Sequence, residues 1–433
     1  MLTLYSWLFR LALPFVLLRL WWRGRAQPDY RRRIRERCGR VPERLSRAPL
    51  VWVHSVSVGE TLAAVPMIAR LARRHPQWQW LVTTMTPTGS ERVLQTLKPL
   101  LGGRLLHYYL PYDLPECLNP FLDRLRPQML VIVETELWPN LLAACARREI
   151  PVLLANARLS ERSARGYRRF AGLTRAMLDN LSAVVAQYPA DAERFVKLGL
   201  CANKVGISGN IKFDLRIDRG LVSEAQVLAH RWRGKGRSVW LAASTHGGEE
   251  EQLLDAFAAL RREFPQLLLV LVPRHPQRFD AVARLVRERG FKLKRHSSGD
   301  WPDESDQVLL GDTLGELLRF YGACDVAFVG GSLVPVGGHN MIEPAAWGIP
   351  VVCGPHLHNF ATVAGMLTQA GAMRVADDGA QLVSIVANWL RDEGARQSAG
   401  LSGKQVAEAN SGALEHLVDE VEKLAVAINP AIQ

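Results

Sequence analysis

A glutamate near the start of a predicted helix is the first residue in this sequence that could carry out acid–base chemistry. Glu60 ends the segment HSVSVGE, which follows an apolar run and precedes an amphipathic stretch at residues 62–74. A helix N-terminus keeps a carboxylate ionised, whereas burial raises its pKa towards a value suited to accepting a hydroxyl proton. We therefore predict Glu60 as a general base. A purely structural role, in which Glu60 complements the helix dipole, fits the same pattern.

Two further glutamates and a lysine could assist such a base. Glu134 and Glu136 follow an apolar run in VIVETELWPN, and Lys212 lies in GNIKFD. Alternate residues of an extended strand share a face, so the two carboxylates could orient the base or bind sugar hydroxyls. Lys212 could offset the charge of a phosphate or carboxylate. A loop-edge ion pair and a solvated lysine are the alternative interpretations.

Three loops in the second half of the chain have residue types suited to binding an anion. Small hydroxyls, glycines and helix-start amides form anion sites, and Arg274 and His275 add donors. Asn340 and Glu343 have the spacing of a helix cap and its third residue, and Glu343 could accept hydrogen bonds from ribose hydroxyls. A capping box without a ligand is the alternative. The loops are STHGGEEE at 244–251, PRHPQRF at 273–279 and VGGSLVPVGGHNMIEP at 329–344.

The elements that must position these residues are short apolar runs alternating with longer amphipathic stretches. This pattern is typical of parallel strands joined by covering helices, which bind ligands beyond the carboxyl ends of the strands. We predict an α/β fold with two Rossmann-like doubly wound domains facing a cleft, at 48–210 and 211–433, behind an anchor at 1–47. The expected strands are 50–56, 78–85, 128–134, 151–157 and 181–187, then 238–244, 267–273, 308–312, 325–331 and 349–354.

The amino-terminal segment predicts attachment to a membrane. Residues 2–22 have about the ~20 residues that a spanning helix needs, although Arg10, Pro14 and Arg19 interrupt the apolar run. The arginine-rich stretch that follows should stay on the cytoplasmic side and attract anionic lipids. No small-residue cleavage site follows the apolar run, which argues against export. Spanning the bilayer and lying in its interface both fit the pattern.

Composition excludes several classes of function. The chain has 433 residues and a net charge of +12, yet it has no zinc-finger spacing and no RNA-binding aromatic strand, so we predict no nucleic-acid partner. Neither a Walker loop nor GxGxxG is present, which disfavours an ATPase or a dehydrogenase. The six cysteines form no CxxC pair, and we predict reduced thiols and no metal site.

Ten ordered motifs resemble those of the bacterial Kdo (3-deoxy-D-manno-octulosonic acid) transferase family. They span nearly the whole chain: HSVSVGE, TTMTPTGSER, YLPYDLP, ETELWPN, NARLSERS, GNIKFD, STHGGEE, LVPRHP, GGSLVPVGGHN and GPHLHNF. The resemblance implies an inverting GT-B glycosyltransferase at the cytoplasmic face of the bacterial inner membrane. It implies transfer of Kdo from CMP-Kdo to the tetraacylated lipid A precursor in lipopolysaccharide inner-core synthesis, without a metal or other cofactor.

The same resemblance implies roles for individual residues. Glu60 matches the family's general base, and Glu134 and Lys212 match residues that stabilise the transition state. GNIKFD varies at positions next to its lysine but retains Lys212. The segment containing Leu314 to Glu316 is assigned from the resemblance alone. The implied CMP contacts are Pro273, Arg274, His275, Leu314, Gly315, Glu316, Asn340, Met341, Ile342 and Glu343.

Two other classes of function fit parts of the pattern. A GT-B-like sugar-nucleotide epimerase would share the nucleotide loops but would need no lipid. A non-catalytic, membrane-bound nucleotide-sugar-binding protein would keep the loops and make Glu60 dispensable. The sequence predicts neither the number of Kdo residues transferred nor the oligomeric state.

Overall fold

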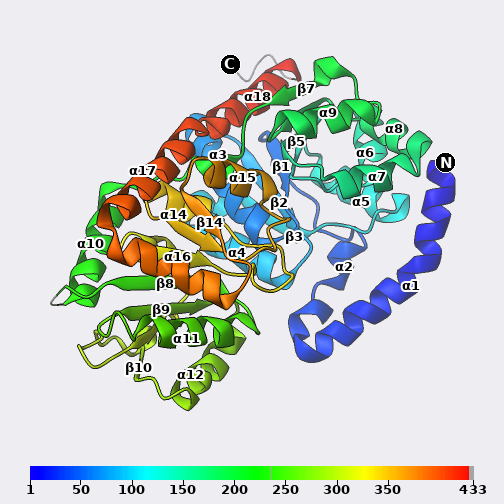
Figure 1. Cartoon of the computed structure of the whole chain (residues 1–433). Helices are drawn as coiled ribbons and strands as arrows, with labels where there is room; N and C mark the ends of the chain where they lie inside the picture. The colour runs from blue at the N-terminus through cyan, green and yellow to red at the C-terminus, as the bar shows by residue number, and fades with distance from the viewer. Residues whose placement is uncertain (235, 429–433) are drawn as a thin grey trace. The chain divides into compact units, whose positions relative to one another are not determined.

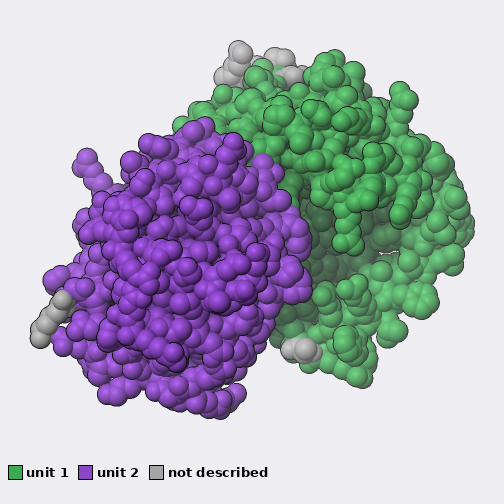
Figure 2. Space-filling model, viewed as in Figure 1, with its two compact units in different colours: residues 1–214, 411–433 green, residues 215–410 purple. Residues whose placement is uncertain are grey.

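The computed structural model describes residues 1–234 and 236–428, which divide into two compact units (Figure 2). Unit 1 contains residues 1–214 and the C-terminal residues from 411 onward, and unit 2 contains residues 215–410. Each unit is built around one parallel sheet of seven strands with helices on its faces (Figure 1). The predicted pair of Rossmann-like α/β domains is therefore confirmed.

The sheet of unit 1 has the strand order β3-β2-β1-β4-β5-β6-β7. Its strands are β1 (Leu50–His54), β2 (Gln79–Thr84), β3 (Leu105–Tyr109), β4 (Met129–Val133), β5 (Val152–Ala157), β6 (Ala183–Ala186) and β7 (Val205–Ile207). Successive side chains of β1 pack into two hydrophobic cores on opposite faces of the sheet: Trp52 packs into one, and Val51 and Val53 pack into the other. Burial on both faces explains why these strands read as continuous apolar runs.

Helices connect these strands and cover both faces of the sheet. They are α3 (Val58–Arg74), α4 (Pro87–Leu101), α5 (Pro115–Leu125), α6 (Pro139–Ala146), α7 (Glu161–Arg168), α8 (Ala171–Asp179) and α9 (Pro189–Lys197). The direction of strand succession reverses between β1 and β4, which lie side by side. In doubly wound sheets this reversal opens the crevice that binds ligands.

Unit 2 repeats this arrangement with the strand order β10-β11-β9-β8-β12-β13-β14. Its strands are β8 (Val239–Thr245), β9 (Leu268–Pro273), β10 (Leu293–Arg295), β11 (Val308–Leu310), β12 (Val326–Val329), β13 (Val351–Cys353) and β14 (Met373–Val375). The reversal falls between β8 and β12. Its helices are α10 (Arg219–Arg233), α11 (Glu249–Leu260), α12 (Phe279–Glu288), α13 (Leu317–Tyr321), α14 (Ile342–Ala346), α15 (Ala361–Gln369), α16 (Gly379–Arg391) and α17 (Glu393–Ala409).

The C-terminal helix α18 (Ala413–Ile428) belongs to unit 1, which corrects the end of the predicted range 211–433. Leu417 and Val421 are buried in the same core as Ile68 of α3. The Asp214 carboxylate accepts hydrogen bonds from the backbone amides of Gly412 and Leu414, at 2.6 and 2.7 Å. The apolar face of α18 is thus buried against the first sheet, a long-range contact that strand spacing does not predict.

The amino-terminal segment forms a 25-residue helix, α1 (Leu2–Ala26), which continues through Pro14. It is followed by a short 3-10 helix, η1 (Pro28–Arg31), and by α2 (Ile34–Arg37). By length and composition, residues 2–25 of α1 could cross a membrane. A signal sequence or a core helix can pass the same test, but this helix is largely exposed.

Candidate functional site

Glu60 lies in the first turn of α3, directly after β1. Ser57 caps this helix and accepts a hydrogen bond from the Glu60 amide. The Glu60 carboxylate bends back over the turn, where it accepts hydrogen bonds from the Val56 amide at 2.6 Å and from the Ser57 hydroxyl at 2.9 Å. The side chain therefore completes a capping arrangement and also has a fixed orientation.

The pKa of Glu60 is raised to about 7, mainly by burial and in addition by the negative charges of Glu134 and Glu136. The hydrogen bonds from Val56 and Ser57 oppose this rise. A glutamate that only complemented a helix dipole would have a lowered pKa. A pKa near neutrality is instead the value that suits a general base at physiological pH.

Glu134 and Glu136 follow β4, the strand next to β1 in the sheet. Glu134 has a φ angle of +62°, a left-handed conformation that costs about 1–2 kcal/mol for a residue with a side chain. Because β4 ends at Val133, the expected shared strand face does not extend to this pair. Their charges nevertheless act together on Glu60, so the three carboxylates form one electrostatic cluster.

Lys212 contributes a positive charge to this carboxylate cluster. Its ammonium group lies 3.3 Å from Oε1 of Glu134, and both side chains are about one quarter exposed. The structure therefore brings together all three residues predicted for the catalytic machinery, Glu60, Glu134 and Lys212. Their chemical roles stay a prediction.

Asn156 holds the segment that carries Lys212, a function that the sequence analysis did not assign. Lys212 belongs to a one-turn 3-10 helix, η4 (Ile211–Phe213). The fully buried Asn156 accepts a hydrogen bond from the Ile211 amide at 3.2 Å, and Asn210 accepts one from the Lys212 amide at 3.0 Å. Asn156 has a φ angle of +52° in β5. An asparagine interrupting the apolar run PVLLANA was the available signal, since asparagine tolerates this conformation better than most residues.

In unit 2, histidines and an arginine gather where β8, β9 and β12 end. The Nε2 atoms of His246 and His339 are 2.7 Å apart, and the two rings are stacked. The ring of His275 meets that of His246 edge-on at 5.2 Å. The pKa of His339 is lowered to about 4, mainly by burial and in addition by the positive charge of Arg274. His246 and His339 lie in predicted loops, but neither was chosen as a site residue.

The glycine-rich loop after β12 uses its amides differently from the prediction. The fully buried Glu249 carboxylate accepts hydrogen bonds from the amides of Gly331, Ser332 and Leu333, at 2.7, 2.9 and 2.9 Å. It also accepts the His246 amide at 2.9 Å. These amides were expected to bind an external anion. They donate instead to the carboxylate of Glu249, which belongs to the same chain. A buried charge requires such donors, which explains the difference.

The predicted nucleotide contacts from Asn340 to Glu343 form one turn. Asn340 donates to Glu343 Oε1 at 2.9 Å and accepts the Ile342 amide at 3.2 Å. The cap position of α14 is Met341, so the capping box expected with Asn340 as cap is wrong by one residue. Met341 and Ile342 are fully buried, so neither exposes a side chain that could contact a ligand in this structure.

The predicted contacts Leu314, Gly315 and Glu316 lie between β11 and α13. Leu314 is 67% exposed, and Gly315 has a φ angle of +84° that favours glycine. Glu316 forms an ion pair with Arg319 and lies 2.9 Å from the His296 ring. The Glu316 side chain thus has partners within unit 2.

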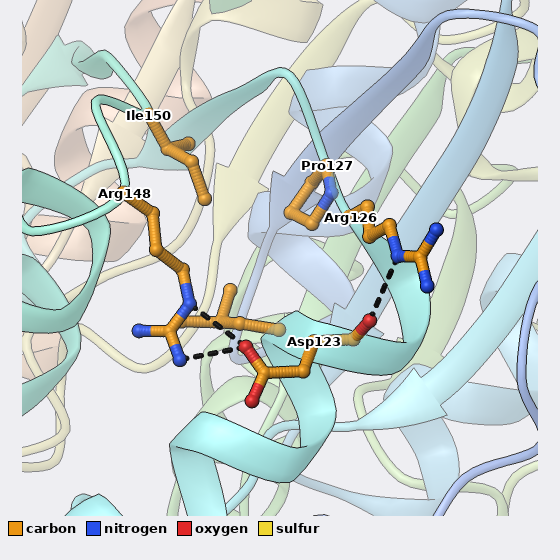
Figure 3. Close-up of a pocket in the computed structure, with 6 residues that line it drawn as sticks. Asp123, Arg126, Pro127, Arg148 and Ile150 are labelled. Carbon is orange, nitrogen blue, oxygen red and sulfur yellow. Dashed lines mark hydrogen bonds and ion pairs between the residues drawn. The ribbon is translucent and has the colours of Figure 1, made fainter.

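Figure 3 shows a surface pocket of unit 1. The pocket lies at the amino ends of the strands, whereas Glu60 follows the carboxyl end of β1. It is found where the chain enters β4 and β5, and Arg148 and Asp123 form an ion pair there at 2.8 Å. None of the predicted site residues lines it. Within residues 1–234 and 236–428, no three His, Cys, Asp or Glu side chains form a group that could hold a metal ion. The lining residues are Leu122, Asp123, Arg126, Pro127, Arg148 and Ile150.

Comparisons with known proteins identify the family. Residues 32–215 match the family described as 3-Deoxy-D-manno-octulosonic-acid transferase (kdotransferase). The chain is 40% identical to the 3-deoxy-D-manno-octulosonic acid transferase of Haemophilus influenzae, over 96% of each chain. It is 37% identical to the protein of that name from Bordetella pertussis, over 96% of this chain and 98% of the relative.

A solved structure supports the fold. The UDP-GlcNAc 2-epimerase of Neisseria meningitidis, bound to UDP-GlcNAc, has a TM-score of 0.57 and 14% sequence identity. The comparison covers 86% of this chain and 100% of that chain, and it places the two Rossmann-like domains in the GT-B class. The sequence identity to these relatives over nearly the whole chain shows that the chain belongs to the 3-deoxy-D-manno-octulosonic acid transferase family.

Proposed function

We propose that this protein transfers Kdo from CMP-Kdo to a hydroxyl of the tetraacylated lipid A precursor, with inversion at the anomeric carbon. Family membership supports a glycosyltransferase that transfers Kdo. The observation that carries the mechanism is the partly buried Glu60, which lies beside Glu134 and Lys212 and has a pKa raised to about 7.

Glu60 acts as the general base in this proposal. It takes the proton of a primary hydroxyl of the lipid-linked disaccharide as the oxygen attacks the anomeric carbon of Kdo. The bond from that carbon to the CMP phosphate breaks, and CMP leaves with both bonding electrons. The hydrogen bonds from Val56 and Ser57 fix the carboxylate, which limits the reorganisation needed for proton transfer.

Lys212 and Glu134 stabilise charge around the reacting groups. The Lys212 ammonium balances negative charge on the Kdo carboxylate or on the departing phosphate, and Glu134 holds that ammonium 3.3 Å away. Glu134 and Glu136 also keep the pKa of Glu60 high. The same carboxylates therefore orient the lysine and keep Glu60 basic enough to accept a proton.

Unit 2 binds the nucleotide in this proposal. Arg274 and His275 supply positive charge and donors to the phosphate, where negative charge grows as CMP leaves. Electrostatic stabilisation of such a leaving group is often the largest contribution to catalysis. The segments around Gly315 and from Asn340 to Glu343 contact the cytidine and ribose. No metal takes part in these steps.

The protein acts at the cytoplasmic face of the bacterial inner membrane. Helix α1 and the arginines that follow it provide attachment to anionic lipids, where the acidic acceptor also resides. The length and composition of α1 support this location. The partners are therefore CMP-Kdo, the lipid A precursor and the surrounding phospholipids.

The test is incubation of the full chain with CMP-Kdo and the lipid A precursor, followed by mass analysis of the lipid. We expect the lipid mass to rise by whole Kdo units and Glu60→Gln to abolish most of this product. Glu193→Gln, an exposed glutamate of α9, is the matched control. Absence of a lipid product with the unaltered protein would refute the transfer. Full activity of folded Glu60→Gln would refute only the base.

A further inference from the structure

One face of α1 is attached to the body of unit 1. Arg10 forms a two-pronged ion pair with Glu116 of α5, at 2.8 and 2.9 Å. Phe9 and Leu13 pack against a small apolar cluster whose buried members are Tyr112, Leu114 and Cys117. These residues of α1 recur three or four positions apart, so they lie on the same side of the helix.

Buried polar groups strengthen this attachment. The Ser6 hydroxyl lies 3.1 Å from Oδ1 of Asn140, and the Tyr5 hydroxyl bonds to the Asp113 carboxylate. Asp113 in turn accepts the amides of Asn140 and Leu141 at the start of α6, at 3.0 and 2.8 Å. We call Tyr5, Ser6, Asp113 and Asn140 the clasp. Separating its members would break these hydrogen bonds and expose polar groups that are now paired in the interior, which costs free energy.

Other residues of α1 form an apolar stripe that the protein leaves uncovered. Its members are spaced alternately by four and three residues over almost the whole helix, and each is between 58% and 74% exposed. Soluble monomers rarely expose a continuous apolar surface of this kind, so the stripe requires a partner. The stripe consists of Leu4, Leu8, Leu11, Phe15, Leu18 and Trp22.

The part of α1 beyond the clasp is too short to cross a bilayer. Between residues 14 and 23, every residue except Leu20 is exposed, whereas one side of the segment 2–13 packs against the rest of unit 1. Ten helical residues extend ~15 Å, about half of the ~30 Å hydrocarbon thickness. A spanning helix would therefore have to pull residues 2–13 out of the clasp and break the Arg10 ion pair.

The charges beside the stripe identify its partner as an anionic lipid surface. Arg23 and Arg25 follow the stripe within one turn of its end, and Arg31 and Arg32 lie nine and ten residues after Trp22. Arg25 and Arg31 also lie over the ring of Trp21, at 4.8 and 4.6 Å, and Arg31 donates to the Trp21 carbonyl. Tryptophan beside arginine is typical of the headgroup region of a membrane.

We propose that α1 lies in the plane of an anionic phospholipid leaflet, with the stripe facing the acyl chains and the clasp holding the helix on unit 1, and that it does not cross the bilayer. This proposal rests on the proposed membrane attachment but not on Kdo transfer. The clasp residue Asn140 lies in the first turn of α6, a few residues after Glu134 and Glu136. A helix held in this way keeps the acceptor-side carboxylates at a constant height above the lipid.

The depth of three probes along the stripe tests this arrangement. The full chain, with Cys38 and Cys201 replaced by serine, would carry a fluorescent label on Leu4→Cys, Leu11→Cys or Leu18→Cys. Vesicles of phosphatidylethanolamine and phosphatidylglycerol would contain quenchers at known depths. An in-plane helix places the three probes at nearly equal depth. A spanning helix separates successive probes by ~10 Å, and this result would overturn the proposal.

Two controls separate the remaining outcomes. A label on Glu193→Cys, far from α1 in sequence and on the exposed face of α9, should not be quenched. Weak quenching at all three stripe positions, together with a dimer in sedimentation, would show that a second copy covers the stripe and would overturn the lipid assignment. Binding is expected to weaken at least about tenfold when phosphatidylglycerol is omitted, since the arginines beside the stripe then lose their attraction to anionic headgroups.

A second measurement asks on which side of the membrane the helix begins. Thr3→Cys lies on an exposed part of α1. In the in-plane arrangement, an impermeant maleimide labels this cysteine in inverted membrane vesicles and not in intact spheroplasts. Labelling in intact spheroplasts would place the N-terminus across the membrane and would contradict the proposal. Activity of each labelled variant confirms that it is folded.

Discussion

The two units place a glutamate at corresponding points of the same scaffold but give it different surroundings. Glu60 lies in the first turn of α3 after β1, and Glu249 begins α11 after β8. Four backbone amides donate to the Glu249 carboxylate, which is fully buried. Glu60 receives one amide and one hydroxyl, and two further carboxylates act on it. Four backbone donors thus give Glu249 a structural role, whereas Glu60 has fewer donors, two carboxylates nearby and a pKa raised to about 7.

The two units also differ in the sign of the charges that gather at the carboxyl ends of their strands. Unit 1 gathers carboxylates with one lysine, which suits proton transfer from an acceptor. Unit 2 gathers Arg274 with His246, His275 and His339, which suits an anionic nucleotide. The parallel sheet with a reversal of strand order is common to both, so the residues at its carboxyl edge decide the chemistry.

The largest expected effect is that of Glu60→Gln. Removing a general base should lower kcat by about 10²–10⁴-fold and leave the KM for CMP-Kdo nearly unchanged. Steady-state kinetics at pH 8, with Glu193→Gln as control, measures this. In the unaltered protein the rate should fall as pH decreases through about 7, because the base becomes protonated. A flat pH profile would break the distinction between Glu60 and Glu249.

Glu249→Gln should destabilise unit 2 without altering proton transfer. The substituted amide turns an NH₂ group towards backbone amides that now donate to a carboxylate, and we expect a loss of about 3 kcal/mol in unfolding free energy. Denaturant titration of the full chain measures it, with the exposed Glu288→Gln of α12 as control. Unchanged stability would show that the four amides do not depend on this charge.

Asn156→Ala should lower activity by about tenfold through displacement of Lys212, since a misplaced catalytic group can cost that much or more. If Asn156 acts only by positioning η4, the effect should largely disappear when Lys212→Met is already present. The measurement is kcat for the two single variants and the double variant. Independent, multiplying losses would assign Asn156 a role of its own.

The smallest effect concerns stability and pH. A carboxylate whose folded pKa is raised from 4.5 to about 7 destabilises the folded state once pH exceeds its unfolded pKa. Glu60→Gln removes this cost, so it should stabilise unit 1 relative to the unaltered protein by about 1–2 kcal/mol more at pH 6 than at pH 4.5. Thermal unfolding at both values measures the difference. An equal effect at both would contradict the raised pKa.

Local patterns predicted the strands and helices that carry the site, and the family resemblance assigned Glu60, Glu134 and Lys212 to one catalytic site. Short apolar runs are sufficient to locate the strands, because a strand buried on both faces consists almost entirely of apolar residues. The capping position of Asn340 was missed by one residue, because a short turn has no strong signal for where it begins. The role of the glycine-rich amides was missed because Glu249 lies more than 80 residues away in sequence.

By itself, the sequence determined the fold class, the family and the edge of each sheet at which charged residues gather, because periodicity and ordered motifs are local properties. Only the tertiary structure decided which carboxylate stays structural, how Asn156 supports Lys212, that α18 completes unit 1 and which face of α1 is left uncovered. Each of these depends on contacts between residues distant along the chain, where burial and hydrogen-bond donors set the state of a charge.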